Sequence, residues 1–484
     1  MKRGLFFISF VFIWFQSEAQ ENMGIANSNY APTNTIFLNP SSSADSKAFF
    51  DLNLIGMSTY ALNNYAYVNG NLISVSKSGA AGNETEVQFD LSSAPYSAYT
   101  DVQIHGPSFS LSYGKFGGGL FSNFRSVTYV SGIPAHLVNH ATNGFDFEDQ
   151  IGNEYTTSNA NVGSLSWLEY GANFSYIIHQ SGRDMYTVGG NLKYLNGIAG
   201  AGLNIQKWNY QVRNDSILDS YEFSGEYGLP NIASEQDDAS GVLGNGSGIG
   251  LDIGFNYKKM LKSAQGYEPH AVGQCDLKDY QYKFGISLLD IGRVKMKSGF
   301  YREFNIEDSL VWEGYNGADP EGLAEIDELI NEELLNFTSD VENSSYKIAL
   351  PTALSAQFDY NFGKGFYANT SLVQGFSRKR KLGVKRNNTF SLTPRYERRQ
   401  VEVALPITIQ NYQKLRLGAA LRIYSVILGT DNLGSLIGGG RTYGADFYFS
   451  FKYTMFRPWY CKDKLKRSSK SRGRKKGGIA CPSW

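Results

Sequence analysis

Alternating apolar and polar side chains recur along the chain, and the last example is the clearest. From Arg441 to Tyr453 the sequence RTYGADFYFSFKY places mainly aromatic residues on one face of an extended segment and small, polar or charged residues on the other. Because side chains alternate faces along a strand, this pattern predicts an amphipathic strand of about eleven to thirteen residues. Its apolar face could pack in the core of a soluble sandwich or contact lipid in a membrane barrel.

The same alternation predicts strands throughout the chain. The first runs from Phe49 to Tyr60, with Phe50, Leu52, Leu54 and Tyr60 on its apolar face. The others are predicted over 101–113, 116–130, 167–178, 186–194, 249–257, 280–290, 348–362, 365–377, 388–397, 400–410, 415–423 and 425–437. We therefore expect about 14 strands. Some connections are tight (180–184, 363–365) and others long (131–163, 195–247, 303–347), an asymmetry typical of membrane barrels.

The first 19 residues have the pattern of a secretory signal peptide. Lys2 and Arg3 precede an apolar run from Leu5 to Phe15, and small residues flank a cleavage site after Ala19. The run is too short to span a membrane as a helix. We therefore expect an exported protein.

Export changes the interpretation of the composition. The chain has 52 Gly, 32 Tyr and 31 Phe, and its mean hydropathy is −0.31. In a membrane barrel only half of each strand is apolar, so a low average hydropathy is expected. This favours an all-β, transmembrane antiparallel barrel of about 14 strands over 48–456, rather than a secreted sandwich or propeller. On the polar faces we expect lumen charges at Asp252, Arg416, Arg422, Asp446 and Lys452.

The zero net charge hides an uneven distribution. The tail, residues 457–484, carries ten Lys or Arg against one Asp. Within the connection 303–347, an amphipathic helix is predicted over 319–337, with six acidic residues from Glu321 to Glu333 and no base. The helix would cap the outer mouth or dock a partner. A periplasmic tail excludes nucleic acid and leaves anionic lipid, an acidic protein surface or simple solvation.

The three cysteines are Cys275, Cys461 and Cys481. In an oxidising compartment Cys461 and Cys481 could form a disulfide around the basic run. A free thiol or an intermolecular bond fits the spacing nearly as well.

The N-terminal segment resembles the hatch of FadL-like outer-membrane barrels, which include the porin-V-type barrels of Bacteroidota. It begins with Gly24-Ile25-Ala26, and Asn39-Pro40-Ser41 precedes the first strand. The resemblance implies that residues 20–47, the hatch, plug the lumen, with Asn39 and Pro40 at the matching positions; Ser41 replaces the usual Ala. Residues 404–453 and 288–293 (LLDIGR) also resemble an uncharacterised Bacteroidota family of outer-membrane barrels.

No pattern predicts catalysis, a metal or a cofactor. His136 and His140 have helical spacing but lie in a loop without a further ligand. The glycine-rich run 244–250 lacks the lysine and helix of a phosphate loop, so we interpret it as a turn. We expect a protein that is not an enzyme.

Two functional hypotheses remain. In the first, the barrel is a subunit or docking partner of an envelope complex for secretion, gliding or barrel assembly, through its tail and acidic helix. In the second, implied by the FadL-like resemblance, the hatch gates passive transport of a hydrophobic small molecule. Both place the protein in the lipid of the outer membrane of a Gram-negative bacterium, with the tail in the periplasm.

Overall fold

The computed structural model describes residues 22–461, apart from 76–85, 93, 144–147, 215, 231–243, 265, 275, 308, 314–344 and 377–381. The predicted signal peptide, the acidic helix over 319–337 and the tail beyond residue 461 lie outside the described residues. No helix among the described residues is long and apolar enough to cross a membrane.

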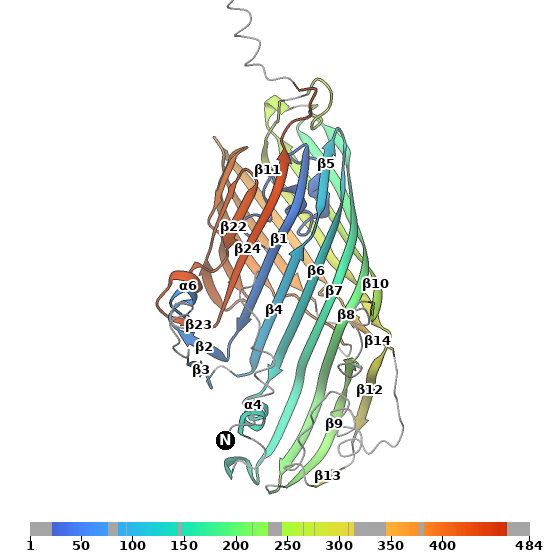
Figure 1. Cartoon of the computed structure of the whole chain (residues 1–484), viewed down its shortest axis with the longest axis vertical. Helices are drawn as coiled ribbons and strands as arrows, with labels where there is room; N and C mark the ends of the chain where they lie inside the picture. The colour runs from blue at the N-terminus through green and yellow to red at the C-terminus, as the bar shows by residue number, and fades with distance from the viewer. Residues whose placement is uncertain are drawn as a thin grey trace, which may run out of the picture.

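Strand pairing closes into a single antiparallel barrel, which confirms the predicted fold class. It has 14 walls, where a wall is one continuous strand or two consecutive strands that together cross the barrel once. The first strand, β1 (Phe50–Asn63), pairs with the last strand, β24 (Gly444–Met455), and on its other edge with β4 (Tyr96–His105) and β5 (Ser108–Tyr113). Figure 1 shows β1 and β24 side by side. The remaining walls are β6 (Phe116–Ile133), β7 (Glu154–Ser181), β8 (Asp184–Val212), β10 (Gly246–Met260), β11 (Tyr280–Met296), β14 with β15 (Tyr346–Ala349, Ala353–Gly363), β16 (Phe366–Gly375), β17 (Thr389–Glu397), β18 with β19 (Val401–Ala404, Ile407–Gln410), β20 with β21 (Lys414–Leu417, Ala419–Ile423) and β22 (Val426–Thr430).

Prolines account for most of the interrupted walls. Pro107 separates β4 from β5, Pro351 separates β14 from β15, and Pro406 separates β18 from β19. Proline has no N–H for the strand ladder, so pairing stops there and resumes beyond it. The predicted strands over 101–113, 348–362 and 400–410 are therefore each divided in two.

Burial along the walls is the reverse of that in a soluble protein. Phe174 and Leu192 are 59% and 60% exposed, whereas their neighbours Asn173 and Asn191 are 5% and 0% exposed. The apolar half of each strand thus faces outward and the polar half faces the lumen, as in transmembrane barrels. This is the alternation that the sequence predicts.

One register change corrects the prediction for the first strand. A bulge between Asn53 and Ile55 turns both Leu54 and Ile55 outward, at 44% and 49% exposure. An extra residue in a strand reverses the faces of all residues beyond it. Tyr60, predicted on the apolar face, is therefore buried in the lumen and donates a hydrogen bond to Gln410 Oε1.

All three of the predicted long loops contain strand structure. β7 and β8 extend past the barrel, and β9 (Ile217–Pro230), β12 (Gly299–Ile306) and β13 (Leu310–Glu313) continue the sheet there. The 3-10 helix η2 (Glu148–Gln150) also lies in this region, and α4 (Ala135–Asn143) lies near this projecting sheet (Figure 1). Trp208, Phe223 and Phe304 belong to its own apolar core.

Smaller differences lie at the last strands. Arg441–Thr442 forms β23, which leaves the barrel and pairs with β2 (Ala66–Asn69), itself paired with β3 (Val87–Phe89). The predicted strand 425–437 ends at Thr430 and is followed by the short helix α6 (Leu433–Ile437).

Because the number of walls is even, β1 begins and β24 ends at the same end of the barrel (Figure 1). We call this end the turn end, because its connections are mostly tight, as between β7 and β8. The longest of them contains η3 (Lys262–Ala264). Most connections at the opposite loop end are long, with the β19–β20 turn as an exception.

A charge on the outer face tests the lipid contact. We expect Leu192→Arg to lower the free energy of unfolding by about 2–4 kcal/mol, the cost of an arginine near the bilayer midplane. Guanidinium titration of the chain folded in lipid vesicles measures this, with Leu192→Met as the matched control. If Arg and Met behaved alike, Leu192 would not face hydrocarbon.

Candidate functional site: the filled lumen

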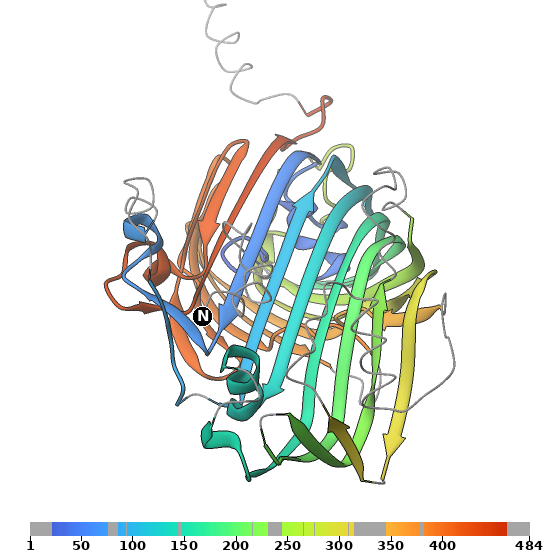
Figure 2. The same cartoon turned by 60° about the horizontal axis from the view of Figure 1, so that its bottom comes forward.

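The hatch lies inside the barrel. Its described part, residues 22–47, contains α2 (Pro32–Thr35) and the 3-10 helix η1 (Pro40–Ser43). A proline begins each helix, where its fixed φ and missing N–H suit the first turn. None of these residues is exposed. Figure 2, seen partly from the loop end, shows this dark blue segment enclosed by the strands.

Asn39 joins the hatch to two walls. Its Nδ2 donates to Phe255 O at 3.2 Å, to Asn256 Oδ1 at 3.2 Å and to Gln357 Oε1 at 3.0 Å. Its Oδ1 accepts bonds from the backbone N and the hydroxyl of Ser41, and so caps η1. The FadL-like resemblance singled out this residue, and its part in gating stays a prediction.

Pro40 contacts the wall where small residues leave room. Its carbonyl accepts a hydrogen bond of 2.9 Å from Asn173 Nδ2. A Cβ added at Gly254 would lie 2.8 Å from Pro40 Cδ, and one at Gly189 would lie 2.6 Å from Ser41 Cα. Glycine is required at both positions because the two backbones approach so closely.

Almost all of the hatch contacts the walls through its own uncharged side chains and backbone groups. The sequence from Asn22 to Ala44 contains no charged residue, and the charged ones are Asp45 and Lys47, next to β1. Lys47 Nζ lies 2.5 Å from Asp279 and 3.7 Å from Glu397, and Asp45 pairs with Lys258. The uncharged groups of the hatch bond to both neutral and charged wall groups: Met23 N to Asp431, Asn27 to Asn369 and Ser371, Ser28 to Glu402, Asn29 to Glu397 and Tyr280, Thr33 to Asp51 and Lys452, Asn34 to Lys452, and Ser43 to Asn173 and Ser175.

Four of the five predicted lumen charges are buried at about 1% exposure or less. Their partners are Lys193 for Asp252 (2.9 Å), Glu402 for Arg422 (3.0 Å), Thr430 for Asp446 (3.1 Å), and Asp51 for Lys452 (2.7 Å). Arg416 is half-buried and lines a cavity near the loop end. The prediction that these five residues form a functional site stays a prediction.

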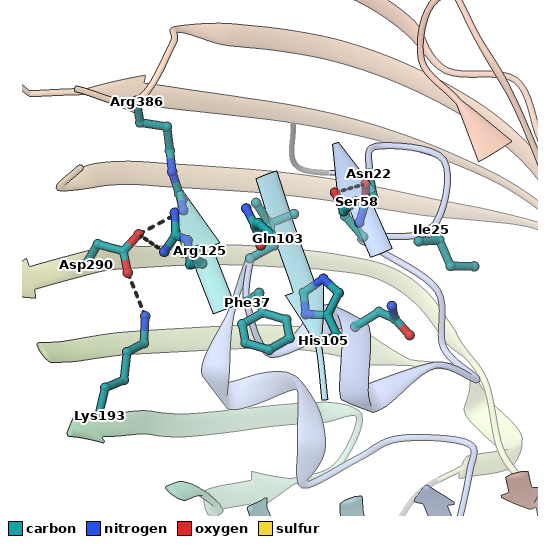
Figure 3. Close-up of a pocket in the computed structure, with 13 residues that line it drawn as sticks. Asn22, Ile25, Phe37, Ser58, Gln103, His105, Arg125, Lys193, Asp290 and Arg386 are labelled. Carbon is teal, nitrogen blue, oxygen red and sulfur yellow. Dashed lines mark hydrogen bonds and ion pairs between the residues drawn. The ribbon is translucent and has the colours of Figure 1, made fainter. Parts of the chain in front are cut away.

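A buried charge cluster centres on Asp290, which sequence reasoning missed as a site residue. Asp290 Oδ2 lies 2.8 Å from Arg125 Nη1 and 2.9 Å from Arg386 Nη2, and its Oδ1 lies 2.6 Å from Lys193 Nζ. Figure 3 shows these groups converging. Asp290 has φ 52° at an irregularity opposite Asp252, whose Oδ1 accepts its N–H. The signal in the sequence is an aspartate within the otherwise apolar run LLDIG.

Little space remains between this cluster and the hatch. Phe37 of the hatch lies against His105, with ring centroids 5.0 Å apart, and both line a cavity that Arg125 and Asp290 also line (Figure 3). Its volume is about 30 Å³. That is enough for one or two water molecules.

A second segment blocks the lumen from the other side. The inner segment, residues 382–388, precedes β17, and its Leu382 and Val384 are buried. Ala349 N donates to Leu382 O and Val384 N donates to Ala349 O, both at 3.1 Å. Arg386 of this segment then reaches Asp290. The sequence has no strong pattern here, so the contact was not predictable from it.

The histidine pair and the cysteines have other settings. His140 Nε2 and Tyr210 hydroxyl form a hydrogen bond of 2.8 Å, and burial lowers the pKa of His140 to about 4. Within the described ranges, no group of three or more His, Cys, Asp or Glu could hold a metal ion. Cys461 is disulfide-bonded. Because Cys481 lies outside the described residues, the predicted Cys461–Cys481 pairing stays a prediction.

Several solved structures align with nearly the whole chain. They include the Ralstonia pickettii toluene transporter TbuX (11% identity, 91% of this chain, 100% of that chain, TM-score 0.40). The Pseudomonas putida toluene transporter TodX (11%, 91%, 99%, 0.40) and a Pseudomonas aeruginosa FadL homologue (9%, 92%, 99%, 0.31) also align. At these values the likeness carries no argument about function.

At the level of sequence, residues 40–431 match the model described as "Family of unknown function (DUF5723)". None of the curated proteins matches the chain. The predicted link to a Bacteroidota family stays a prediction.

We expect Asp290→Asn to destabilise the barrel by about 3–5 kcal/mol, because Arg125, Lys193 and Arg386 would lose their shared buried counter-ion. Urea unfolding in detergent measures the change. The control is Glu222→Gln, whose partner Lys207 is 46% exposed in an exterior ion pair that contributes about 0–1 kcal/mol. Equal losses in the two variants would contradict a role for burial.

Proposed function

This chain belongs to the DUF5723 family, and we propose that it is a gated channel of the Gram-negative outer membrane. A small hydrophobic molecule would pass passively through the barrel when the hatch and the inner segment before β17 move aside. The turn end, which holds the start of β1 and the end of β24, would then face the periplasm and the loop end the exterior.

The way in which the hatch is docked carries this proposal. The main ion pairs of the lumen join one wall strand to another: Arg422 to Glu402, Lys452 to Asp51, and Arg125 to Asp290. Departure of the hatch would leave these charges paired. The hydrogen bonds of residues 22–44 would be exchanged for bonds to water, at a net cost of about 0.5–1.5 kcal/mol for each bond to a neutral wall group and about 1.5–3 kcal/mol for each bond to a charged one.

The charged contacts of the hatch lie where a pivot would be. Asp45 and Lys47 pair with Lys258 and Asp279 only a few residues before β1 begins at Phe50. These pairs would hold the root of the hatch to the wall while the uncharged part moved. The arrangement supports a tethered gate rather than a segment that leaves the barrel altogether.

An apolar layer supports a hydrophobic passenger. On the loop side of Asp290 the interior is lined by a buried cluster that includes Trp167, Leu195 and Met296. A cavity of about 80 Å³ lies beside it, against Leu203 and Leu382. A hydrophobic molecule entering from the loop end would meet this layer before the charge cluster and the hatch.

The alternative role, docking in an envelope complex, depends on the acidic helix over 319–337 and the basic tail. Apart from the first residues of the tail, both lie outside the described residues. No contact within the described part of the chain favours that role over a channel.

A disulfide lock tests the gate. Ser43 of the hatch and Ser175 of β7 have hydroxyl oxygens 2.7 Å apart, so Ser43→Cys with Ser175→Cys should fasten the hatch to the wall. We expect the oxidised variant to reduce uptake of radiolabelled toluene to the background of cells without the chain. Dithiothreitol should restore uptake, because the hatch regains its freedom to move.

The matched control joins two walls. Ser126 and Ser166 on β6 and β7 have hydroxyl oxygens 2.8 Å apart, so Ser126→Cys with Ser166→Cys adds an equivalent disulfide without touching the hatch. Its uptake should equal that of the unmodified chain in both redox states. If the locked hatch and this control transported equally well, hatch movement would play no part.

A further inference from the structure

A cavity of about 260 Å³ lies near the loop end of the barrel. Its lining comes from four places in the sequence: the end of β1 with the start of β4, residues 129–131 of β6, the inner segment, and the β19–β20 turn with β20. Three lining side chains are cations, namely Lys385, Lys414 and Arg416, and no described lining residue is an acid. We call this cavity the cationic vestibule.

Among the described residues no carboxylate lines the vestibule; Arg416 interacts electrostatically with Asp446, which lies outside the lining, and contacts the Tyr60 hydroxyl. Lys414 Nζ lies 3.8 Å from the ring centroid of Tyr443, and Lys385 Nζ lies 5.9 Å from that of Tyr129. Arg416 Nη1 is buried and has no hydrogen-bond partner within the described ranges. A buried guanidinium donor without an acceptor is energetically unfavourable, and an anionic ligand would supply the acceptor.

The absence of a carboxylate from its described lining distinguishes the vestibule from the cluster around Asp290. Around Asp290 each cation has a carboxylate within hydrogen-bonding distance. The other polar lining groups of the vestibule include the amides of Asn63, Asn64 and Gln413, which can donate to oxygen. The chemistry is that of an oxyanion site, and three cations match a multivalent anion better than a monovalent one.

We propose that the cationic vestibule binds a soluble phosphate-type oxyanion, such as inorganic phosphate or a phosphate monoester. Lys385 belongs to the inner segment, whereas Lys414 and Arg416 belong to the wall. The β19–β20 turn already holds this segment, since Asn411 N donates to Asn388 O at 2.8 Å. A bound anion would add a bridge between the two and hold the inner segment in its blocking position.

Equilibrium dialysis of the full chain with radiolabelled phosphate, in a detergent without a phosphate group, tests the site. We expect saturable binding that weakens with added salt, because charge attraction drives it. Arg416→Gln and Lys385→Gln should each weaken binding about tenfold, the loss of one charge-assisted hydrogen bond. Glycerol 3-phosphate should compete with phosphate and uncharged glycerol should not.

Lys262→Gln is the matched control, because Lys262 is an exposed lysine of η3 at the turn end. It should bind phosphate as the unmodified chain does. Heat-modifiable migration on gels establishes that each variant is folded. Absence of saturable binding, equal competition by glycerol, or unchanged binding in Arg416→Gln would overturn the proposal. The measurement needs no transport, so its result is independent of whether the hatch gates a channel.

Discussion

Contact between lipid and the outer face of each strand is the constraint on which the rest of the structure depends. It forces the polar half of every wall inward, so the interior of this barrel is lined by hydroxyls, amides and charges. A lumen open to water could solvate them. Here the hatch and the inner segment exclude water from most of it, and buried charges must then be paired. Lys452 beside Asp51 and Arg395 beside Asp359 follow from this requirement.

Asp290 lies between the two segments that fill the lumen, the hatch and the inner segment. The hatch enters from the turn end and brings Phe37 to the cavity beside the cluster, while the inner segment enters from the loop end and brings Arg386 to the carboxylate itself. Asp290 is held there by an irregularity in β11, which turns its side chain inward from a run of apolar residues. In the proposed channel the hatch and the inner segment would be two barriers in series, and both would have to move for a molecule to pass.

The sequence predicts the barrel well because the relevant signal is local. Alternation along 167–178 or 249–257 needs no knowledge of neighbouring strands, and the outward Phe174 and inward Asp252 follow from it. The failures occur where a local rule changes: the bulge at Asn53 that turns Tyr60 inward, and the division of walls at Pro107, Pro351 and Pro406. The strands of the projecting sheet were missed because their apolar residues pack against each other and not against lipid.

The lumen was harder to predict because its contacts join residues far apart in the sequence. Alternation placed Arg422 and Lys452 on the polar face, but nothing local pairs Arg125 with Asp290 or brings Arg386 into the barrel.

One property of the hatch was nevertheless visible in the sequence: residues 22–44 are uncharged, although the lumen that they fill is lined with charges. A permanent plug could use buried ion pairs, and breaking one such pair costs about 3–5 kcal/mol. Hydrogen bonds made by uncharged hatch groups cost less to exchange for water, about 0.5–1.5 kcal/mol each to neutral wall groups and about 1.5–3 kcal/mol each to charged ones. The choice of side chains in the hatch is therefore consistent with a segment that must leave its position and return.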